Sequence, residues 1–545
     1  MSSTDPAEQF SSNAHNLCKP LPKDVAMSLP MVDQTERWID EQLGRMTPAQ
    51  KLAQRLLVLP GVDAGRPDAA TCQALELGVG ALHSVTGMPA SAAARYHNAV
   101  ARICADAAVP PALISGNLES GVAYSLGTSG THLPYPRGVG LAGDAEVAYR
   151  VAAAGAVEAR SVGYHWTFSP CVDVISVPDD PILGVRAYGV PAPETAELGS
   201  AQIRGYQDHG VLATAKHFPG HGDSTVDSHL GLPRITRSRA AYEADHLPPF
   251  RAAVEAGVAT VMVAHLVLPE LGVAEPASLS ARVNRGWLRS ELGFTGVIVT
   301  DSLRMAAIAD SHQPATAALL ALRAGADVAN VKCPAELAPQ IVEHLLEAMA
   351  DGALDETELD DSVRRLLVAR ARIGLDTNNP VDENRAAGLD AALAWNDETR
   401  AGTVSIHPAG RGPWPSLADG GFVVVGDSPL ARRLVELGSR RGLRLMLEPD
   451  PLAEGILTRV AARHPGRPVV PVFCPRTDPV AHQRESVHRV TADAPSAVAA
   501  VVVNSVSSAE YFGEVGHPVV TTPAVDAFGI VTDAAVDATL DVLCR

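Results

Sequence analysis

The chain has 545 residues and a formal net charge of −18 at pH 7, and 46% of its residues are hydrophobic while only 4% are aromatic. This length far exceeds the roughly 100–200 residues of a typical domain, so we expect a large domain and at least one more. The negative charge, with lysines and arginines scattered along the chain, argues against nucleic acid or an anionic membrane as a partner.

The seven cysteines show no CxxC spacing. They stand at positions 18, 72, 104, 171, 333, 474 and 544. Their odd number and wide separation argue against a disulfide framework or a cysteine zinc site. The polar N-terminal residues lack the apolar core of a signal peptide, and no apolar stretch approaches the length of a membrane span. We therefore expect a soluble, cytoplasmic protein with reduced thiols.

The first part of the chain predicts an arm followed by two helices. Residues 1–30 are polar and show no period, which indicates a loosely held N-terminal arm. Residues 34–46 carry apolar side chains at helical spacing. The motif Thr47-Pro48-Ala49-Gln50 then supplies an N-cap, a first-turn proline and a capping-box residue, so a second helix is expected to continue through Leu56.

Apolar runs that are typical of buried strands then alternate with helical patterns such as 144–162 and 316–324. The runs span residues 79–83, 112–115, 166–174, 211–215, 258–266, 296–300 and 326–331. Strands alternating with helices imply right-handed crossovers and a parallel sheet. About seven such units predict an α/β fold of the (β/α)8 or TIM-barrel type for residues 31–375. A helix at 354–373 completes this domain.

Beyond the predicted barrel, residues 376–420 are rich in Asp, Asn, Gly and Pro, which indicates a linker with one helix near 385–394. Residues 421–545 form a second α/β segment. Its predicted strands lie at 422–428, 469–473, 497–504 and 519–521, with a helix at 430–441. This pattern predicts a small αβα sandwich domain.

One motif is set aside as a turn. Gly138–Gly143 matches G-x-G-x-x-G, but prolines precede it where a dinucleotide site requires a buried strand. We therefore expect a turn that leads into the helix capped by Asp144. The G-x-S-x-G elbow and the P-loop are missing from the sequence, which removes the common signatures of serine hydrolases and nucleotide hydrolases.

In a TIM barrel, active-site residues lie at the C-terminal ends of strands and in the loops beyond them. Six polar residues fall at such places: His83, Arg186, Lys216, His217, His265 and Asp301. Asp301 follows a predicted strand directly, where it is a helix N-cap, a metal ligand or a carboxylate nucleophile. Arg186, Lys216 and a protonated His217 would offer donors only, which suits a ligand rich in oxygen.

The polar loop 216–229 also carries candidate chemistry. Asp227 and His229 are two residues apart, so the carboxylate can orient the imidazole and support its protonated form for acid–base catalysis near pH 7. The alternatives are a solvent-exposed polar loop or a metal cluster of His221, Asp223, Asp227 and His229.

Three segments together resemble glycoside hydrolase family 3, and most closely its β-N-acetylglucosaminidase (β-N-acetylhexosaminidase) branch. They are Arg186-Ala187-Tyr188-Gly189, the string from Lys216 to His229, and Val299-Thr300-Asp301-Ser302-Leu303-Arg304-Met305. The similarity runs in order over roughly 43–372. It implies that Asp301 is the nucleophile, that His229 is the acid/base and that Asp227 is its partner.

The resemblance further implies a set of residues that bind the sugar. They are Arg186, Lys216, His217, Asn117, Glu119, His265 and Met305. One segment departs from the family string D-x-E-G-G-R-V-x-R, because Asn117 and Ser125 replace its first Asp and last Arg. An amide carries no charge and a serine cannot replace an arginine fork, so the preferred sugar stays open.

The implied activity is that of a retaining, exo-acting β-N-acetylglucosaminidase or hexosaminidase, with a carbohydrate substrate and with no cofactor or metal. An imidazole base would not repel an anionic acceptor as a carboxylate does, so phosphorolysis with inorganic phosphate is an alternative. More remote alternatives are a family 3 β-glucosidase, a metal-dependent hydrolase and a sugar-binding protein without catalysis.

Overall fold

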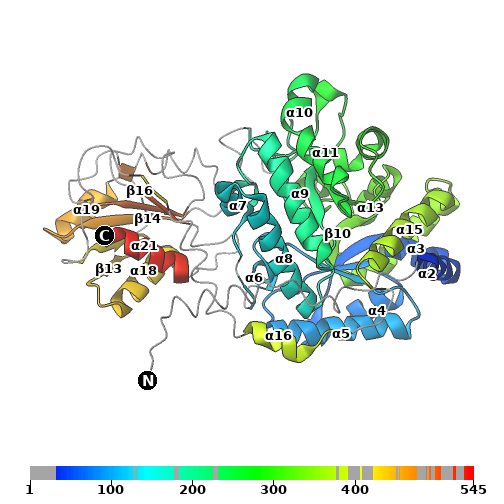
Figure 1. Cartoon of the computed structure of the whole chain (residues 1–545), viewed down its shortest axis with the longest axis horizontal. Helices are drawn as coiled ribbons and strands as arrows, with labels where there is room; N and C mark the ends of the chain where they lie inside the picture. The colour runs from blue at the N-terminus through cyan, green and yellow to red at the C-terminus, as the bar shows by residue number, and fades with distance from the viewer. Residues whose placement is uncertain are drawn as a thin grey trace.

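The protein forms two α/β units, a larger N-terminal one and a smaller C-terminal one (Figure 1). The structure is a computed structural model that describes residues 32–126, 129–131, 133–176, 183–224, 231–375, 380–390, 405–407, 421–449, 452, 455–474, 487, 490–491, 498–504, 519–522 and 533–544. Among these residues, the structure contains no helix that is long and apolar enough to cross a membrane.

The N-terminal unit is built on eight parallel strands. They are β1 (Leu56–Leu59), β4 (Ala81–His83), β5 (Leu113–Gly116), β6 (Trp166–Thr167), β7 (Thr214–Phe218), β8 (Thr260–Val263), β9 (Val297–Thr300) and β10 (Ala329–Pro334). One sheet has the order β10-β1-β4-β5-β6 and the other the order β7-β8-β9. Parallel bridges from Trp166 to Leu212 and from Val299 to Val328 join the two sheets. The pairing order therefore passes through all eight strands and returns to β10, as expected for a (β/α)8-type fold.

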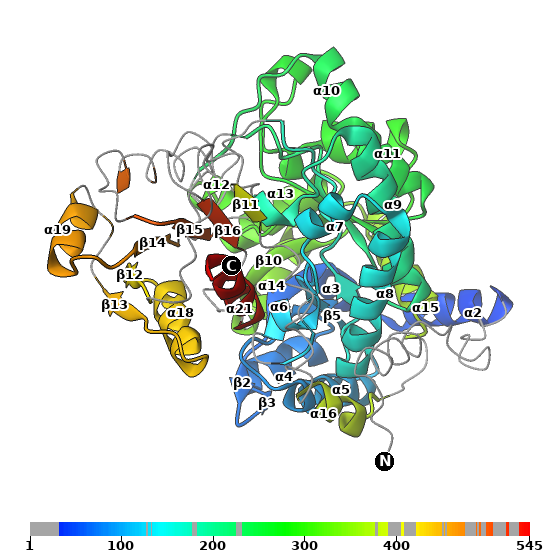
Figure 2. The ribbon, with the colours of Figure 1, turned by 60° about the vertical axis from the view of Figure 1, so that its left-hand side comes forward.

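Helices surround these strands (Figures 1 and 2). The α-helices are α2 (Val32–Arg45), α3 (Pro48–Gln54), α4 (Ala69–Glu76), α5 (Ala90–Asp106), α6 (Val122–Leu126), α7 (Pro136–Ala142), α8 (Ala145–Val162), α9 (Ala192–Asp208), α10 (Arg239–Asp245), α11 (Leu247–Glu255), α12 (Ala306–Ala309), α13 (Pro314–Arg323), α14 (Ala338–Ala350), α15 (Glu356–Arg372) and α16 (Glu383–Asp390). Short elements are the hairpin strands β2 (Val62–Asp63) and β3 (Arg66–Pro67), the 3-10 turns η2 (Gly184–Arg186), η3 (Pro269–Leu271), η4 (Ala277–Leu279) and η6 (Ala335–Leu337), and the π-helix η5 (Arg282–Glu291).

The helix caps predicted from the sequence are confirmed. Thr47 accepts a hydrogen bond from the Gln50 amide, and the Gln50 side chain accepts one from the Thr47 amide, so the capping box is complete. Asp144 caps α8 by accepting bonds from two backbone amides of its first turn. In both places a polar side chain satisfies amides that have no partner within the helix.

Two local predictions are wrong. Leu56 was expected in a helix, but α3 ends at Gln54 and Leu56–Leu59 form β1 between β10 and β4. A short apolar run fits a buried strand as well as a buried helix, and pairing with two neighbouring strands decides between them here. The motif Gly138–Gly143 was expected as a turn, but its first residues belong to α7. Its Gly140 packs so closely that an added Cβ would lie 2.1 Å from the Tyr188 carbonyl oxygen.

The interior of the strand ring is filled by side chains. One cluster unites inward residues in and next to the strands with two residues of α15 and its C-cap Ile373: Leu57, Ala81, Leu113, Trp166, Phe168, Leu212, Ala259, Met262, Val297, Val299, Val328, Leu366, Ala369 and Ile373. Alternate strand residues such as Leu56 and Val58 pack outward against the helices in a second, larger cluster. The Trp166 indole donates to the hydroxyls of Thr214 and Thr260 at 2.9 and 3.0 Å. The unit therefore has a solid core, and chemistry is confined to its ends.

The C-terminal unit has the order β11-β16-β15-β14-β12-β13 in one sheet, in which only the β11–β16 pair is antiparallel. Its elements are β11 (Ser405–His407), β12 (Val423–Val425), α18 (Pro429–Arg440), β13 (Met446–Glu448), α19 (Ile456–Arg463), β14 (Val469–Phe473), β15 (Val501–Asn504), β16 (Val519–Thr522) and α21 (Asp533–Leu543). Helices α18 and α21 pack on one face of the sheet and α19 on the other, which is the predicted αβα sandwich.

The range predicted as a linker contributes to both units. Within 376–420, helix α16 contacts α5, and the Asn98 amide donates to the Val381 carbonyl at 3.0 Å. Strand β11 lies in the same range and pairs with β16. Parts of this range therefore belong to folded structure on either side.

Candidate active site

Polar side chains gather where the eight strands end. They are His83, Glu119, Asp173, Lys216, His217, His265, Asp301 and Lys332, each at the C-terminal end of a strand or in the loop directly after it. Parallel strands place these ends on one edge of the sheet. Side chains that are more than 200 residues apart in the chain thus meet at one mouth.

Glu119 is the charge partner of two predicted sugar-binding residues. Its Oε1 accepts from Lys216 Nζ at 2.7 Å and from Arg186 Nη2 and Nε at 3.0 and 3.2 Å. Burial would raise the pKa of Glu119, but the Lys216 and Arg186 charges outweigh it and lower that pKa to about 2. Glu119 Oε2 is buried and has no partner among the described residues, so it is free to accept a ligand hydroxyl.

Asp173 was missed by the sequence analysis. Its Oδ2 accepts from the His217 amide at 2.9 Å and from His217 Nδ1 at 2.7 Å, and its Oδ1 accepts from the His221 amide at 2.7 Å. Burial opposes the charge of Asp173, but His217 and the hydrogen bonds lower its pKa to about 2. The available signal was an acid inside the apolar run 166–174, because unpaired carboxylates are rarely buried.

The expectation that His217 offers only donors is corrected. Burial lowers the pKa of His217 despite the nearby Asp173, so the ring is neutral at pH 7. Its Nδ1 must carry the proton that Asp173 accepts, which leaves a lone pair on Nε2. His217 therefore presents an acceptor to the site.

Asp301 is a half-buried carboxylate at the end of β9, open enough to meet a ligand. Its Oδ1 accepts from the Ser302 amide at 2.7 Å. Burial would raise the pKa of Asp301, but the imidazoles of His217 and His265 hold it below its usual range. The group is thus ionised at neutral pH, as a nucleophile must be.

His265 holds the backbone next to Asp301. Its Nε2 donates to the Ser302 carbonyl at 2.9 Å, and its Nδ1 contacts the Ser278 hydroxyl at 2.7 Å. His265 is 1% exposed, so it positions the segment that carries Asp301. Met305 lies in the same segment, where its amide donates to the Ser302 carbonyl and its side chain is buried.

The two departures from the family string lie near Glu119. Asn117 is partly buried and makes no hydrogen bond to another described residue. Ser125 is buried and donates to the Ser84 hydroxyl at 3.1 Å.

Asp227 and His229, the proposed acid–base pair, lie outside the described residues, in 225–230. The same holds for half of the alternative metal cluster. Of its other members, Asp223 accepts from Ser176 at 2.7 Å and pairs with Arg237, while the His221 amide donates to Asp173. The loop that leads to the acid–base pair is therefore anchored up to Ser224.

A metal ion would find one set of ligand atoms among the described residues. Cys171, Asp173 and His217 each offer an atom, all within 4.8 Å of one another. Hydrogen bonding accounts for their approach, since Cys171 Sγ and His217 Nδ1 both contact Asp173 Oδ2. Burial raises the pKa of the Cys171 thiol well above its ordinary value, so the sulfur keeps its proton.

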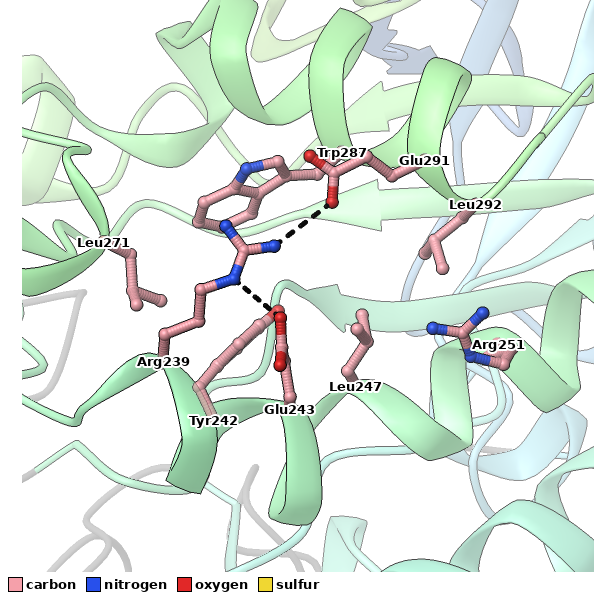
Figure 3. A pocket seen from close by; sticks show the side chains of 9 residues that line it. All are labelled: Arg239, Tyr242, Glu243, Leu247, Arg251, Leu271, Trp287, Glu291 and Leu292. Atoms are coloured by element: carbon pink, nitrogen blue, oxygen red, sulfur yellow. Dashed lines mark hydrogen bonds and ion pairs between the residues drawn. The ribbon is translucent and has the colours of Figure 1, made fainter.

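A separate pocket lies beside α10, α11 and η5 (Figure 3), and it contains none of the predicted site residues. Arg239 crosses it and pairs with Glu243 at 2.6 Å and Glu291 at 3.6 Å. The Tyr242 hydroxyl donates to the Pro219 carbonyl at 2.6 Å. Tyr242, which lines this pocket, therefore supports the loop after β7 from outside the ring of strand ends.

Comparisons with known proteins agree with this geometry. The model of the glycosyl hydrolase family 3 N terminal domain matches residues 71–369. Beta-hexosaminidase A of Pseudoalteromonas piscicida is 33% identical over 271 residues, which cover 45% of this chain and 45% of that protein. Beta-hexosaminidase LpqI of Mycobacterium tuberculosis is 40% identical over 215 residues, which cover 38% of this chain and 54% of LpqI. The chain thus spans about half the length of these relatives.

Among solved structures, a glycoside hydrolase family 3 β-N-acetylglucosaminidase from Paenibacillus sp. str. FPU-7 superposes with a TM-score of 0.77 at 27% identity. The match covers 92% of this chain and 97% of that one. The similarity therefore includes both units of the fold.

The Glu119 cluster yields a first prediction. Glu119→Gln should lower the free energy of unfolding by about 3 kcal/mol, because it leaves the buried Lys216 and the neighbouring Arg186 without a countercharge. Urea unfolding followed by circular dichroism measures this. The control is Glu243→Gln, which removes an exposed ion pair and should lower it by less than about 1 kcal/mol. Equal losses in the two variants would show that Glu119 is not a structural hub.

Proposed function

Because the chain belongs to glycosyl hydrolase family 3, we propose that it is a retaining, exo-acting β-N-acetylhexosaminidase that releases terminal N-acetyl-hexosamine from a carbohydrate. The observation that carries this proposal is the ionised, half-buried carboxylate of Asp301 at a strand end, in one ring with Glu119 and Lys216. The relatives named β-hexosaminidase support the choice of sugar.

In the first step, an Asp301 oxygen attacks the anomeric carbon while the bond from that carbon to the leaving oxygen breaks. His229, protonated and paired with Asp227, gives its proton to the departing oxygen. In the second step, His229 takes a proton from water, and the water oxygen displaces Asp301 from the sugar. Each step inverts the anomeric centre, so the configuration is retained overall.

The described side chains have distinct tasks in this scheme. Glu119 Oε2 accepts a sugar hydroxyl, while Lys216 and Arg186 donate to sugar oxygens from positions fixed by Glu119. The neutral His217 offers an acceptor at Nε2, because its Nδ1 hydrogen is held by Asp173. Fixed donors and acceptors of this kind hold the ring in the orientation for attack.

Phosphorolysis is the second candidate, and the sequence feature that favours it is a histidine where other glycosidases use a carboxylate acid/base. An imidazole does not repel phosphate, so phosphate can replace water in the second step and form a sugar 1-phosphate. The products distinguish the two reactions. Incubation of an aryl β-N-acetylglucosaminide with an excess of inorganic phosphate should yield free sugar if hydrolysis dominates. A sugar 1-phosphate seen by 31P NMR would favour phosphorolysis.

The nucleophile can be tested directly. Asp301→Asn should reduce turnover of every β-glycoside by at least about a thousandfold, because no covalent bond to carbon can form. Release of 4-nitrophenol measures the loss, and mass spectrometry of wild-type protein with a slow fluorinated substrate should find the sugar on Asp301. The control is Asp310→Asn, which changes an exposed carboxylate nearby and should leave the rate within twofold. A label on another residue would contradict the assignment.

The acid/base residue gives a further prediction. His229→Gln should slow glycosides with poor leaving groups by about 10²–10⁴-fold and 2,4-dinitrophenyl glycosides far less, because an activated leaving group needs no proton. The basic limb of the pH–rate profile should disappear in the same variant. The pKa of Glu119 is lowered to about 2 and that of Asp301 lies below its usual range, so both carboxylates keep their charge well below neutral pH and neither produces a limb near neutrality. His344→Gln, a partly exposed histidine on α14, is the control. Equal slowing of both substrate types would refute the role of His229.

A further inference from the structure

Lys332 is a cation at the mouth of the strand ring that the proposed mechanism does not use. It lies near the end of β10, where the register with β1 shifts between Leu57 and Leu59. Its φ angle is +44°, in the left-handed region that lysine seldom adopts. The adjacent strand end carries Asp301, since the Leu303 amide donates to the Asn330 carbonyl at 2.9 Å. The backbone therefore delivers a long cationic side chain beside the nucleophile.

The ammonium group of Lys332 has no hydrogen bond or ion pair with any described residue, although the side chain is partly buried. Burial lowers its pKa, and the charges that act on it most strongly are those of Asp301 and Lys216. Lys216 and Arg186 already share Glu119. Among the described cations of the site, Lys332 is thus the one that does not contact Glu119, and its ammonium group can donate to an anionic ligand.

His83 is the polar residue at the end of β4, which only β1 separates from β10 and Lys332. The Ser125 hydroxyl donates to the Ser84 oxygen at 3.1 Å, so Ser84 can give its own hydrogen to His83 Nδ1 at 3.2 Å. Burial and the Lys332 charge lower the pKa of His83 to about 3, so the ring is neutral. A neutral ring that accepts at Nδ1 carries its hydrogen on Nε2. That Nε2 is buried and has no partner among the described residues.

We propose that Lys332 and the Nε2–H group of His83 form a subsite for an anionic oxygen group, either a carboxylate on the sugar that Asp301 attacks or a free phosphate. This proposal rests on the proposed glycosidase function and adds a substrate class to it. A carboxylate or phosphate oxygen between these two donors would receive one charge-assisted and one neutral hydrogen bond.

Geometry favours the sugar carboxylate over the phosphate acceptor. In a retaining reaction the nucleophile and the acceptor approach opposite faces of the ring. Lys332 and Asp301 stand on adjacent strand ends, so we place Lys332 on the face of the ring that Asp301 attacks, away from the acceptor. A competing role is that Lys332 only neutralises Asp301, and this role would affect every substrate equally.

The experiment compares 4-nitrophenyl β-glucuronide with 4-nitrophenyl β-glucoside, which differ only in a carboxylate at C6. Lys332→Gln should raise KM for the glucuronide by about tenfold or more and leave that for the glucoside within twofold, because one charge-assisted bond is lost. Lys332→Arg, which keeps the charge, should bring KM for the glucuronide most of the way back to the wild-type value. Arg304→Gln is the control, since it removes an exposed charge whose side chain, among the residues that the structure describes, donates to the Lys332 carbonyl alone.

The change in melting temperature on adding glucuronate or inorganic phosphate measures binding to the subsite without requiring turnover. If glucuronate raises the melting temperature of the wild type but not of Lys332→Gln, the subsite binds a sugar carboxylate. If this difference between wild type and variant is seen with phosphate instead, the subsite binds phosphate. Equal kcat losses for both glycosides, or shifts that Lys332→Gln does not change, would overturn the proposal. If wild-type protein hydrolyses the aryl β-N-acetylglucosaminide while these tests fail, only the subsite is refuted. If it hydrolyses no glycoside, the proposed function fails, and the thermal shifts still decide the subsite.

Discussion

The arrangement of this site depends on one buried carboxylate oxygen. Glu119 Oε1 accepts from both Lys216 and Arg186, so a single atom ties together the loop after β5, the end of β7 and the short turn η2. Lys216 is 1% exposed and could not stay charged in such a place without a countercharge. The two cations are therefore aimed by a structural ion cluster before any sugar arrives, and the remaining oxygen of Glu119 points to a hydroxylated ligand.

A second carboxylate, Asp173 in the loop after the adjacent strand β6, sets the chemistry beside the Glu119 cluster. By accepting from Nδ1 of His217, Asp173 fixes the tautomer of that imidazole and turns its Nε2 into an acceptor. The same carboxylate holds the His221 amide, so it also anchors the loop that leads to Asp227 and His229. Asp173 thus fixes the protonation of His217, and His217 in turn influences the charge of Asp301.

Local signals in the sequence predicted local structure well. The caps at Thr47 and Asp144 and the placement of Asp301 after a strand needed only neighbouring residues, and they are confirmed. Leu56 was misassigned because pairing with β4 and β10 cannot be read from a four-residue apolar run. Asp173 was missed for a related reason, since its partner His217 lies 44 residues away. Long-range pairing is a property of the closed fold, and the sequence does not carry it explicitly.

The corner formed by Ser125, Ser84 and His83 shows what surrounds the serine that stands where the family string has an arginine. Ser125 is buried, and its hydroxyl lies 2.7 Å from where a Cβ on Gly116 would stand, so a larger side chain at 125 would crowd β5. The Ser125 hydroxyl donates to Ser84, and Ser84 in turn contacts His83, so the serine joins a hydrogen-bonded chain where an arginine would bring a charge. The cation Lys332 lies near the end of β10, which is parallel to the strand that His83 ends.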